Sequence, residues 1–317
     1  MRMRLIAVAV LLLTALAAAQ TAPQKTMAIT LDDLPKAVVG GDMDKGDIND
    51  VRATIWQLTG DLRGTPVLGF VNERKLFVPG ELDARLAVLQ MWLADGHELG
   101  NHTFSHLDFQ TTPLAVFEAD ILHGEALTGD LLRRAGQTER YFRFPYNHTG
   151  ATQQDKEALE QFLRAHGYTV APFTIQHDDY IFNDVYTRAR RSWNSELQEK
   201  VRAAYLAHLD TALDFCERVT NQLFGHQIPQ VLLIHANDLN ADAISDMLAR
   251  LRQRGYKFIT LEEALRDPAY QTQDEYVGPY GISWLQRWAV NKGVTVDKNE
   301  PDPPAWVLEL YNAAHKK

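Results

Sequence analysis

The chain contains very little cysteine: Cys216 is the single thiol among 317 residues. One thiol cannot form an internal disulfide, and a chain of this length buries enough apolar surface to fold without one. The surrounding segment LDTALDFCERV has the apolar spacing of a helix. We therefore interpret Cys216 as a small side chain of the core.

Long apolar runs are also scarce, and the longest one is at the N-terminus. Leu5–Leu16 follows the basic residues Arg2 and Arg4 and precedes Ala17–Ala19. This apolar run is about 12 to 15 residues long, whereas a membrane-spanning helix needs roughly 20. A basic start, an apolar centre and small residues are typical of a secretory signal peptide. We predict a Sec-type signal at residues 1–19, a periplasmic or secreted protein, and no transmembrane anchor after cleavage.

Positive charge is in deficit, with 32 Lys and Arg residues against 41 Asp and Glu residues. The formal net charge of −9 becomes −11 when the predicted signal peptide, which carries two arginines, is removed. Nucleic acid is therefore not expected as a partner, because its binding depends on basic side chains. An acidic surface keeps a protein in solution and mildly favours a neutral or cationic substrate. The oligomeric state stays open.

Seven short runs rich in β-branched or aromatic residues alternate with segments of helical periodicity. They are Thr26–Leu31, Pro66–Val71, His97–Asn101, Tyr141–Phe144, Thr169–Ile175, Val231–Ile234 and Lys257–Ile259. Such alternation predicts an α/β fold in which parallel strands are joined by crossover helices. Seven to eight units of this kind could close into a barrel.

Two stretches interrupt the alternation. Residues 183–227 have a mostly helical pattern that is too long for one crossover helix, so we expect two helices inserted before the sixth strand. Residues 267–317 are rich in aromatic residues and proline, and we expect them to form helices packed on the outside of the barrel. The predicted organisation is thus a signal peptide (1–19), a barrel domain with an insertion (20–266) and a C-terminal extension (267–317).

Two adjacent carboxylates follow the first apolar strand, in the sequence Asp32-Asp33-Leu34-Pro35. Neighbouring residues on a strand point to opposite sides, so both carboxylates can face one site only where the chain turns. Pro35 is consistent with a turn there. Taken alone, the pattern is as typical of an ordinary turn as of a site.

His102 and His106 follow the third strand. We expect them to lie on one helical turn, where residues four apart share a face and could hold one metal ion. His97, at the start of the strand, is better interpreted as a structural residue.

Further polar groups follow the fourth, fifth and sixth strands. They are Arg143 with Pro145 and Tyr146, then Asp179, then His235. Taken singly, Arg143 could be a surface cation and His235 a core histidine. Together, however, they all fall at carboxyl ends of strands, where parallel α/β folds gather ligand and catalytic groups. The sequence therefore predicts one site lined by carboxylates, histidines and an arginine. Two histidines near these motifs, His148 and His177, could contact a substrate, but we interpret them as exposed loop residues.

The ordered motifs resemble those of the polysaccharide deacetylase family, also called the NodB homology domain or carbohydrate esterase family 4. The resemblance runs from Thr26 to Leu265 and includes the paired aspartates, His102-Thr103-Phe104-Ser105-His106, Arg143-Phe144-Pro145-Tyr146 and Leu233-Ile234-His235. Two positions depart from the family pattern: Leu31 replaces the usual phenylalanine, and Asp179-Tyr180 stands where Asp-Trp is usual.

The resemblance implies a distorted (β/α)7-type barrel and a divalent metal, with zinc expected first and cobalt, nickel, manganese or iron open. It implies that Asp33, His102 and His106 are the metal ligands. Three protein ligands leave open positions for water and substrate, and bound zinc brings the pKa of its water toward about 7.

The resemblance also implies a role for each remaining motif residue. Asp32 would be the general base and His235 the general acid; Arg143 would orient Asp32, Asp179 would tune His235, and the Tyr146 amide, after Pro145, would hold the oxyanion. Histidine suits the acid because its unperturbed pKa of about 6.5 lets it carry a proton near neutrality.

The expected function is an exported, metal-dependent hydrolase that removes acetyl groups from a carbohydrate, with N-acetyl favoured and O-acetyl open. Non-haem iron oxygenases also use two histidines and a carboxylate, but they do not account for Asp32, Arg143 or His235. Two alternatives stay open: a glycan-binding protein without catalysis, and a deacylase acting on a small non-sugar amide. The substrate could equally be chitin oligomers, peptidoglycan, exopolysaccharide or acetylated xylan.

Overall fold

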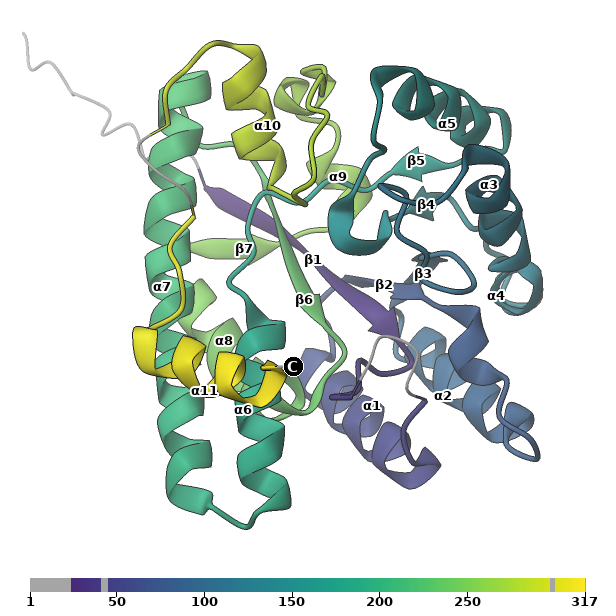
Figure 1. Cartoon of the computed structure of the whole chain (residues 1–317), viewed down its shortest axis with the longest axis vertical. Helices are drawn as coiled ribbons and strands as arrows, with labels where there is room; N and C mark the ends of the chain where they lie inside the picture. The colour runs from purple at the N-terminus through teal and green to yellow at the C-terminus, as the bar shows by residue number, and fades with distance from the viewer. Residues whose placement is uncertain (1–23, 41–44, 297–299, 317) are drawn as a thin grey trace, which may run out of the picture.

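A curled parallel sheet surrounded by helices forms the centre of the molecule (Figure 1). The computed structural model describes residues 24–40, 45–296 and 300–316. The predicted signal peptide, residues 1–19, lies outside these ranges. Within them, no helix is both long enough and apolar enough to span a bilayer.

The strands pair in the order β5-β4-β3-β2-β1-β6, and β7 pairs with the beginning of β1. Their bounds are β1 (Lys25–Leu34), β2 (Val67–Val71), β3 (Glu98–Asn101), β4 (Tyr141–Phe142), β5 (Thr169–Val170), β6 (Gln230–His235) and β7 (Tyr256–Phe258). All pairs are parallel. Beyond β5, an isolated bridge from Ile175 to Leu232 of β6 joins the two ends of the curled sheet. The predicted distorted α/β barrel is confirmed.

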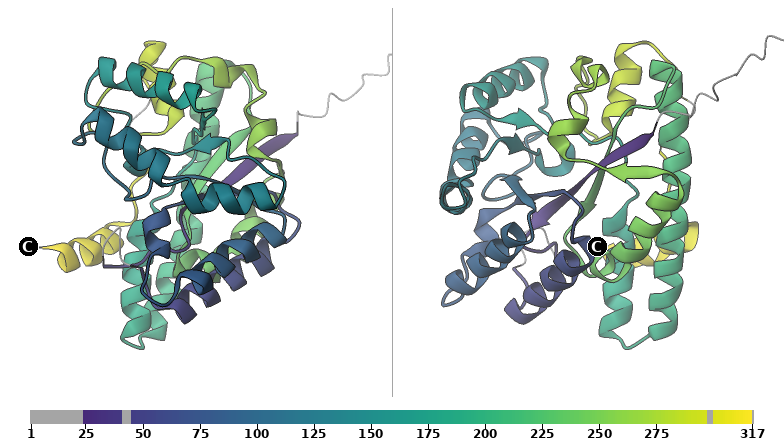
Figure 2. Two further views of the ribbon diagram at one scale, coloured as in Figure 1. Left: turned by 90° about the vertical axis from the view of Figure 1, so that its right-hand side faces the viewer. Right: turned by 180° about the vertical axis from the view of Figure 1, so that it is seen from behind.

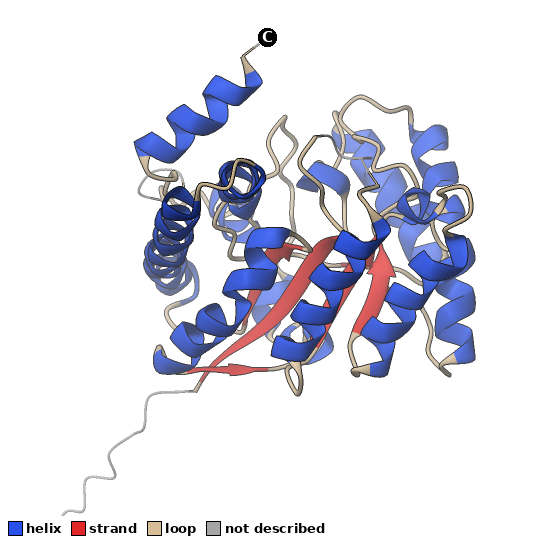
Figure 3. Cartoon of the chain, turned by 90° about the horizontal axis from the view of Figure 1, so that it is seen from below, coloured by secondary structure: helices blue, strands red, loops and turns tan. Residues whose placement is uncertain are grey.

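Helices alternate with the strands and cover the outside of the sheet (Figures 2 and 3). The helices of the barrel are α1 (Ile48–Leu62), α2 (Leu82–Ala94), α3 (Leu114–His123), α4 (Ala126–Arg134), α5 (Gln153–Ala165), α8 (Asp238–Gln253) and α9 (Leu261–Ala264). Three short 3-10 turns are η1 (Glu73–Leu76), η2 (Pro145–Asn147) and η3 (Pro268–Gln271). β1 lies at the centre and is buried from Met27 to Leu34, as expected for a parallel strand covered on both faces.

The insertion before β6 consists of two long helices, α6 (Asp179–Arg191) and α7 (Ser195–Phe224), which pack against each other. The C-terminal extension supplies α10 (Trp284–Asn291), which packs on α7, and α11 (Ala305–His315), which packs on α6. Figure 1 shows α11 in yellow beside α6, and Tyr311 and His315 of α11 line the same cavity as Asp32 and His235. Both additions therefore lie at the side of the barrel where the predicted site residues gather.

The end of β1 has an irregular backbone that determines where its two carboxylates point. The strand continues to Leu34, three residues beyond its predicted end at Leu31, and its register with β2 shifts between these two residues. Asp33 has a left-handed backbone with φ of 70°. This kink replaces the simple alternation of a strand, so Asp32 and Asp33 can face the same site.

Candidate active site

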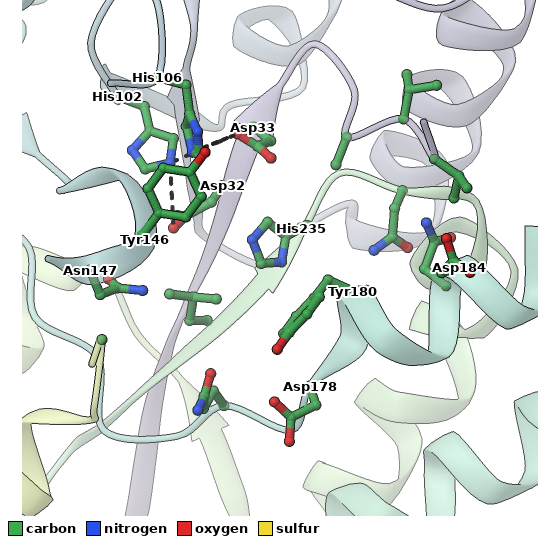
Figure 4. A pocket seen from close by; sticks show the side chains of 18 of the residues that line it. Asp32, Asp33, His102, His106, Tyr146, Asn147, Asp178, Tyr180, Asp184 and His235 are labelled. Atoms are coloured by element: carbon green, nitrogen blue, oxygen red, sulfur yellow. Dashed lines mark ion pairs between the residues drawn. The ribbon is translucent and has the colours of Figure 1, made fainter. Parts of the chain in front are cut away.

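A cavity of about 630 Å³ opens at the carboxyl ends of β1 and β6 (Figure 4). Its lining includes the predicted residues Asp32, Asp33, His102, His106, Tyr146 and His235. Arg143, Pro145 and Asp179 are buried behind this lining. A volume of this size suits a ligand of a few rings, since small-molecule sites span roughly 300 to 1,000 Å³.

Asp33, His102 and His106 form a compact group of buried side chains at one end of the cavity. One ligand atom from each lies within 4.8 Å of the others. Asp33 Oδ1 is 3.5 Å from His106 Nε2 and 3.9 Å from His102 Nε2, and the dashed lines in Figure 4 mark such contacts. Two imidazole nitrogens and one carboxylate oxygen are donors that zinc and similar divalent ions prefer. The three residues therefore fit a divalent metal.

The loop that carries the two histidines is not helical, so the prediction of a helical turn was wrong. Thr103 and His106 have positive φ values of 64° and 54°. Asn101 Oδ1 accepts a hydrogen bond from the Thr103 amide at 2.7 Å, and Thr103 Oγ1 accepts one from the His106 amide at 2.9 Å. Short polar side chains that bond to nearby amides compete with helix formation, and here they shape the loop.

His102 is held in the tautomer that a metal ligand requires. Its Nδ1 lies 2.7 Å from the carbonyl oxygen of Arg143. A carbonyl oxygen only accepts, so Nδ1 carries the hydrogen and the lone pair of Nε2 faces the other ligands. Burial lowers the pKa of His102 to about 4, which keeps the ring neutral at pH 7.

Lys75 is a site residue that the sequence did not reveal. It follows β2 in η1, is buried, and places Nζ 3.4 Å from both Asp33 Oδ1 and the Asp33 carbonyl oxygen. Burial raises the pKa of Asp33. The positive charge of Lys75 and, after it, His106 lower this pKa by more than burial raises it, so the net shift is downward. Asp33 is therefore an anion over the whole physiological range. The one signal in the sequence was the position of Lys75 after a strand.

Asp32 lies beside the metal ligands but has different neighbours. Its Oδ2 is 3.7 Å from Arg143 Nη1 and 3.9 Å from His102 Nε2. In the part of the chain that the structure describes, Asp32 Oδ1 is buried and accepts no hydrogen bond. The carboxylate thus keeps one oxygen available for a proton.

Arg143 is fully buried, which excludes the interpretation of a surface cation. Its Nη2 donates to Thr30 Oγ1 at 3.0 Å, and its guanidinium lies 4.9 Å from the centre of the Phe70 ring. These contacts fix the guanidinium against Asp32. Thr30, two residues before Asp32 on β1, is a further contributor that the sequence did not single out.

His235 lies across the cavity from His102 and His106 (Figure 4), and it forms a tight pair with Asp179. Its Nδ1 donates to Asp179 Oδ1 at 2.8 Å, and its backbone amide donates to Asp179 Oδ2 at 2.7 Å. Burial would lower the pKa of His235, but the charge and the hydrogen bond of Asp179 raise it to about 9. This raised pKa favours the protonated ring of His235 at neutral pH.

Asp179 is held in turn by two amides that the sequence gave no reason to select. Asn237 Nδ2 and Asn240 Nδ2 donate to Asp179 Oδ2 at 3.0 and 2.6 Å. Burial raises the pKa of Asp179, but His235 lowers it, and the net shift is downward. The first residue of α6, in the insertion, is thus the partner of the histidine on β6.

Tyr146 lies in η2 at the edge of the cavity, with its ring 4.7 Å from the ring of His106. Its backbone is left-handed, with φ of 55°. Pro145 is buried and does not line the cavity. Tyr146 and Tyr180 line it with partly exposed rings, as does Tyr280 of the extension. Exposed aromatic rings around a cavity offer apolar faces to a ligand.

His177 is buried, so its interpretation as an exposed loop histidine was wrong. Its ring stacks on Tyr205 of α7 at 4.6 Å, and burial lowers its pKa to about 3. The cause is the long helix α7, which covers it. His148 also differs from the expectation of exposure: it is half-buried and lines the cavity, and its Nδ1 lies 2.8 Å from Asp108 Oδ1.

The sequence profile of the family described as Polysaccharide deacetylase matches residues 19–171. The chain contains a polysaccharide deacetylase domain. The matched part covers β1 to β5 and holds the carboxylate pair and the two ligand histidines. His235 and Asp179 come from the part of the chain beyond the match. No curated protein sequence matches the chain.

Solved structures of the same fold include a carbohydrate esterase family 4 pseudoenzyme from Bacillus anthracis. It is 15% identical, with a TM-score of 0.50 over 77% of this chain and 66% of that chain. A mutant of it with restored enzymatic activity gives the same identity and TM-score over 77% of this chain and 69% of that one. A family 4 carbohydrate esterase from Streptomyces lividans in complex with acetate is 16% identical, with a TM-score of 0.45 over 77% and 97%. At such identities the likeness of the first two shows the fold alone.

Proposed function

We propose that this chain is an exported, metal-dependent hydrolase that removes acetyl groups from a carbohydrate, with N-acetyl groups favoured and O-acetyl groups possible. Family membership supports a hydrolase of acetylated carbohydrate. The observation that carries the proposal is the convergence of two groups on one cavity. The triad with Asp32 lies on one side, and the pair of His235 with Asp179 lies on the other.

The donor set of Asp33, His102 and His106 would hold the metal, for which zinc is the first expectation and cobalt, nickel, manganese or iron remain open. A divalent ion bound there supplies a Lewis acid that lowers the pKa of water and polarises an acetyl carbonyl. The protein supplies the ligand geometry, the neutral His102 and the anionic Asp33.

Asp32 would act as the general base. Arg143 fixes its carboxylate from behind, and Oδ1 is buried without a hydrogen bond within the described residues, so this oxygen can take a proton from the attacking water. The Tyr146 amide would donate to the developing oxyanion, as preorganised amides do in acyl transfer.

His235 would act as the general acid. In its charged form it carries a second hydrogen on Nε2 while Nδ1 stays bonded to Asp179. An amine leaving group needs that proton because an unprotonated amide nitrogen leaves poorly. The raised pKa of His235 keeps the donor charged at neutral pH.

Binding without catalysis is the main competing function, because the pseudoenzyme shows that this fold occurs without activity. The presence of a base, an acid and a complete ligand set in one cavity favours catalysis here. The partly exposed rings of Tyr146, Tyr180 and Tyr280 favour a sugar over a small aliphatic amide, since the apolar face of a sugar ring can stack on an aromatic ring.

The decisive experiment measures acetate release from a panel of N- and O-acetylated glycans, with a small acetylated amine included for the non-sugar alternative. Wild type is compared with Asp32→Asn, each with chelator and after zinc is restored. We expect release that chelator abolishes, that zinc restores, and that Asp32→Asn lacks. Asp130→Asn, a change at a half-exposed residue of α4 outside the cavity, is the matched control. Absence of chelator-sensitive release from every substrate, with intact zinc binding, would reject the hydrolase in favour of a binding protein.

A further inference from the structure

The turn that carries Tyr146 has an unusual backbone. Tyr146 and Asn147 are consecutive residues, and both have left-handed φ values, 55° and 56°. This backbone conformation is unfavourable for residues other than glycine, so two such residues in a row need contacts from other segments to hold them. Those contacts come from residues 274–287 of the C-terminal extension, which we call the clamp segment.

Gly281 of the clamp segment lies directly against the turn. A Cβ atom at this position would be 2.0 Å from the carbonyl oxygen of Tyr146 and 3.0 Å from Cβ of Asn147. Non-bonded carbon and oxygen atoms do not approach to 2.0 Å, so glycine alone permits the contact. Any larger residue must push either the extension or the Tyr146 peptide out of place.

Arg287 of α10 donates hydrogen bonds to the same turn. It is fully buried, its Nη2 donates to the Asn147 carbonyl oxygen at 2.6 Å, and its Nη1 donates to Thr149 Oγ1 at 3.1 Å. Asp274 accepts from Nη1 at 3.0 Å and neutralises the buried charge. A planar guanidinium with several fixed donors can hold two points of one turn at once, which a lysine cannot do.

The clamp segment is itself anchored to the barrel. The Trp284 amide donates to the Phe173 carbonyl oxygen at 2.9 Å, and Leu285 and Trp288 are buried in the main core. Lys156 of α5 pairs with Asp274 at 2.7 Å. The segment is therefore a rigid support and not a loosely attached tail.

We propose that Gly281 and Arg287 are positioning residues of the active site, because they hold the Tyr146–Thr149 turn in the backbone conformation that the reaction requires. This inference rests on the proposed function, in which the Tyr146 amide donates to the oxyanion. It gives a role to a segment that lies outside the region of the family match. Active sites in which a group is displaced by about 1 Å can lose roughly a hundredfold in rate.

The test uses the zinc-loaded full chain with Gly281→Ala and Arg287→Lys. Gly60→Ala on α1 is the matched control, because a Cβ there meets nothing within 4 Å. We expect kcat to fall roughly 10- to 100-fold in both variants, as for a displaced oxyanion donor, while KM stays within about twofold. The Gly60→Ala protein should keep wild-type kinetics.

Hydrogen exchange of the peptide spanning residues 144–150 gives a second readout that needs no substrate. Exchange of this peptide should be faster in both variants than in wild type and the control, while exchange in the strands of the barrel stays unchanged. Unchanged exchange, or faster exchange with unchanged kcat, would overturn the positioning role. If wild type releases no acetate from any substrate, the proposed function fails, while faster exchange in the variants would still support the clamp.

Discussion

Asp32 and Asp33 are neighbours in sequence, yet their surroundings differ completely. The left-handed backbone at Asp33 turns its carboxylate to Lys75 and the two ligand histidines, whereas Asp32 lies against Arg143. One residue of backbone irregularity therefore separates the proposed metal ligand from the proposed base. The same distinction applies across the cavity, where Asp179 determines the charge of His235.

Replacing Asp179 with asparagine should shift the pH dependence of activity. The largest contribution that raises the pKa of His235 disappears, and burial then lowers that pKa from about 9. His235 must be protonated to act as an acid, so the loss of kcat/KM at high pH should begin at a lower pH in Asp179→Asn. The measurement is a pH profile of kcat/KM at saturating zinc.

The raised pKa of His235 also makes the free energy of unfolding depend on pH. A raised histidine pKa contributes stability that is fully present below pH 6.5 and is lost as the pH rises through about 9. Unfolding by urea at several pH values should show this loss in wild type and a smaller one in Asp179→Asn. If kcat/KM begins to fall at the same high pH in wild type and Asp179→Asn, His235 is not the general acid.

At the scale of elements, the carboxyl end of β1 is tied to the start of two helices by a buried lysine. Lys36 places Nζ 2.6 Å from Asp238 Oδ1 at the start of α8 and also pairs with Asp50 on α1. Thr54 and Thr187 donate to Asp238 as well. This network holds the chain three residues after Asp33, the proposed metal ligand.

Lys36→Met should therefore destabilise the protein by about 3 kcal/mol, the lower end of the cost of leaving a buried charge without its partner. The lower end applies because Asp50 is half-exposed, and because Asp238 keeps its hydroxyl donors and the guanidinium of Arg190, whose Nη1 lies 3.6 Å from Asp238 Oδ1. Urea unfolding measures the change, with the exposed Lys257→Met as control. Equal stability of the two variants would show that the network contributes nothing to the junction.

At the scale of the whole molecule, metal binding should be visible as global stabilisation. A ligand that binds the folded state alone adds about 2.7 kcal/mol when its free concentration is a hundredfold above Kd. Zinc should raise the thermal midpoint of wild type, chelator should reverse the rise, and His106→Ala should abolish it. Calorimetry measures the midpoints, and a zinc response that His106→Ala retains would place the metal elsewhere.

Two local predictions were wrong, one because of hydrogen bonds within a loop and one because of packing between elements. The segment from His102 to His106 has helical spacing, but the side-chain oxygens of Asn101 and Thr103 accept hydrogen bonds from its amides and fold it into a loop. His177 lies in a segment without an apolar pattern, and α7 covers it from outside. In both cases the local structure depends on side-chain contacts that the spacing of residues in the sequence does not reveal.

The sequence by itself determined the order of strands and helices and the residue types at the strand ends. Alternation of β and helical patterns is local, and parallel strands necessarily bring their carboxyl ends to one edge, so a shared site follows from order alone. Only the tertiary structure decided that Lys75 faces Asp33 and that the extension supports Tyr146. The bond between Arg287 and Asn147 joins residues 140 positions apart, and no periodicity or motif records a contact of that range.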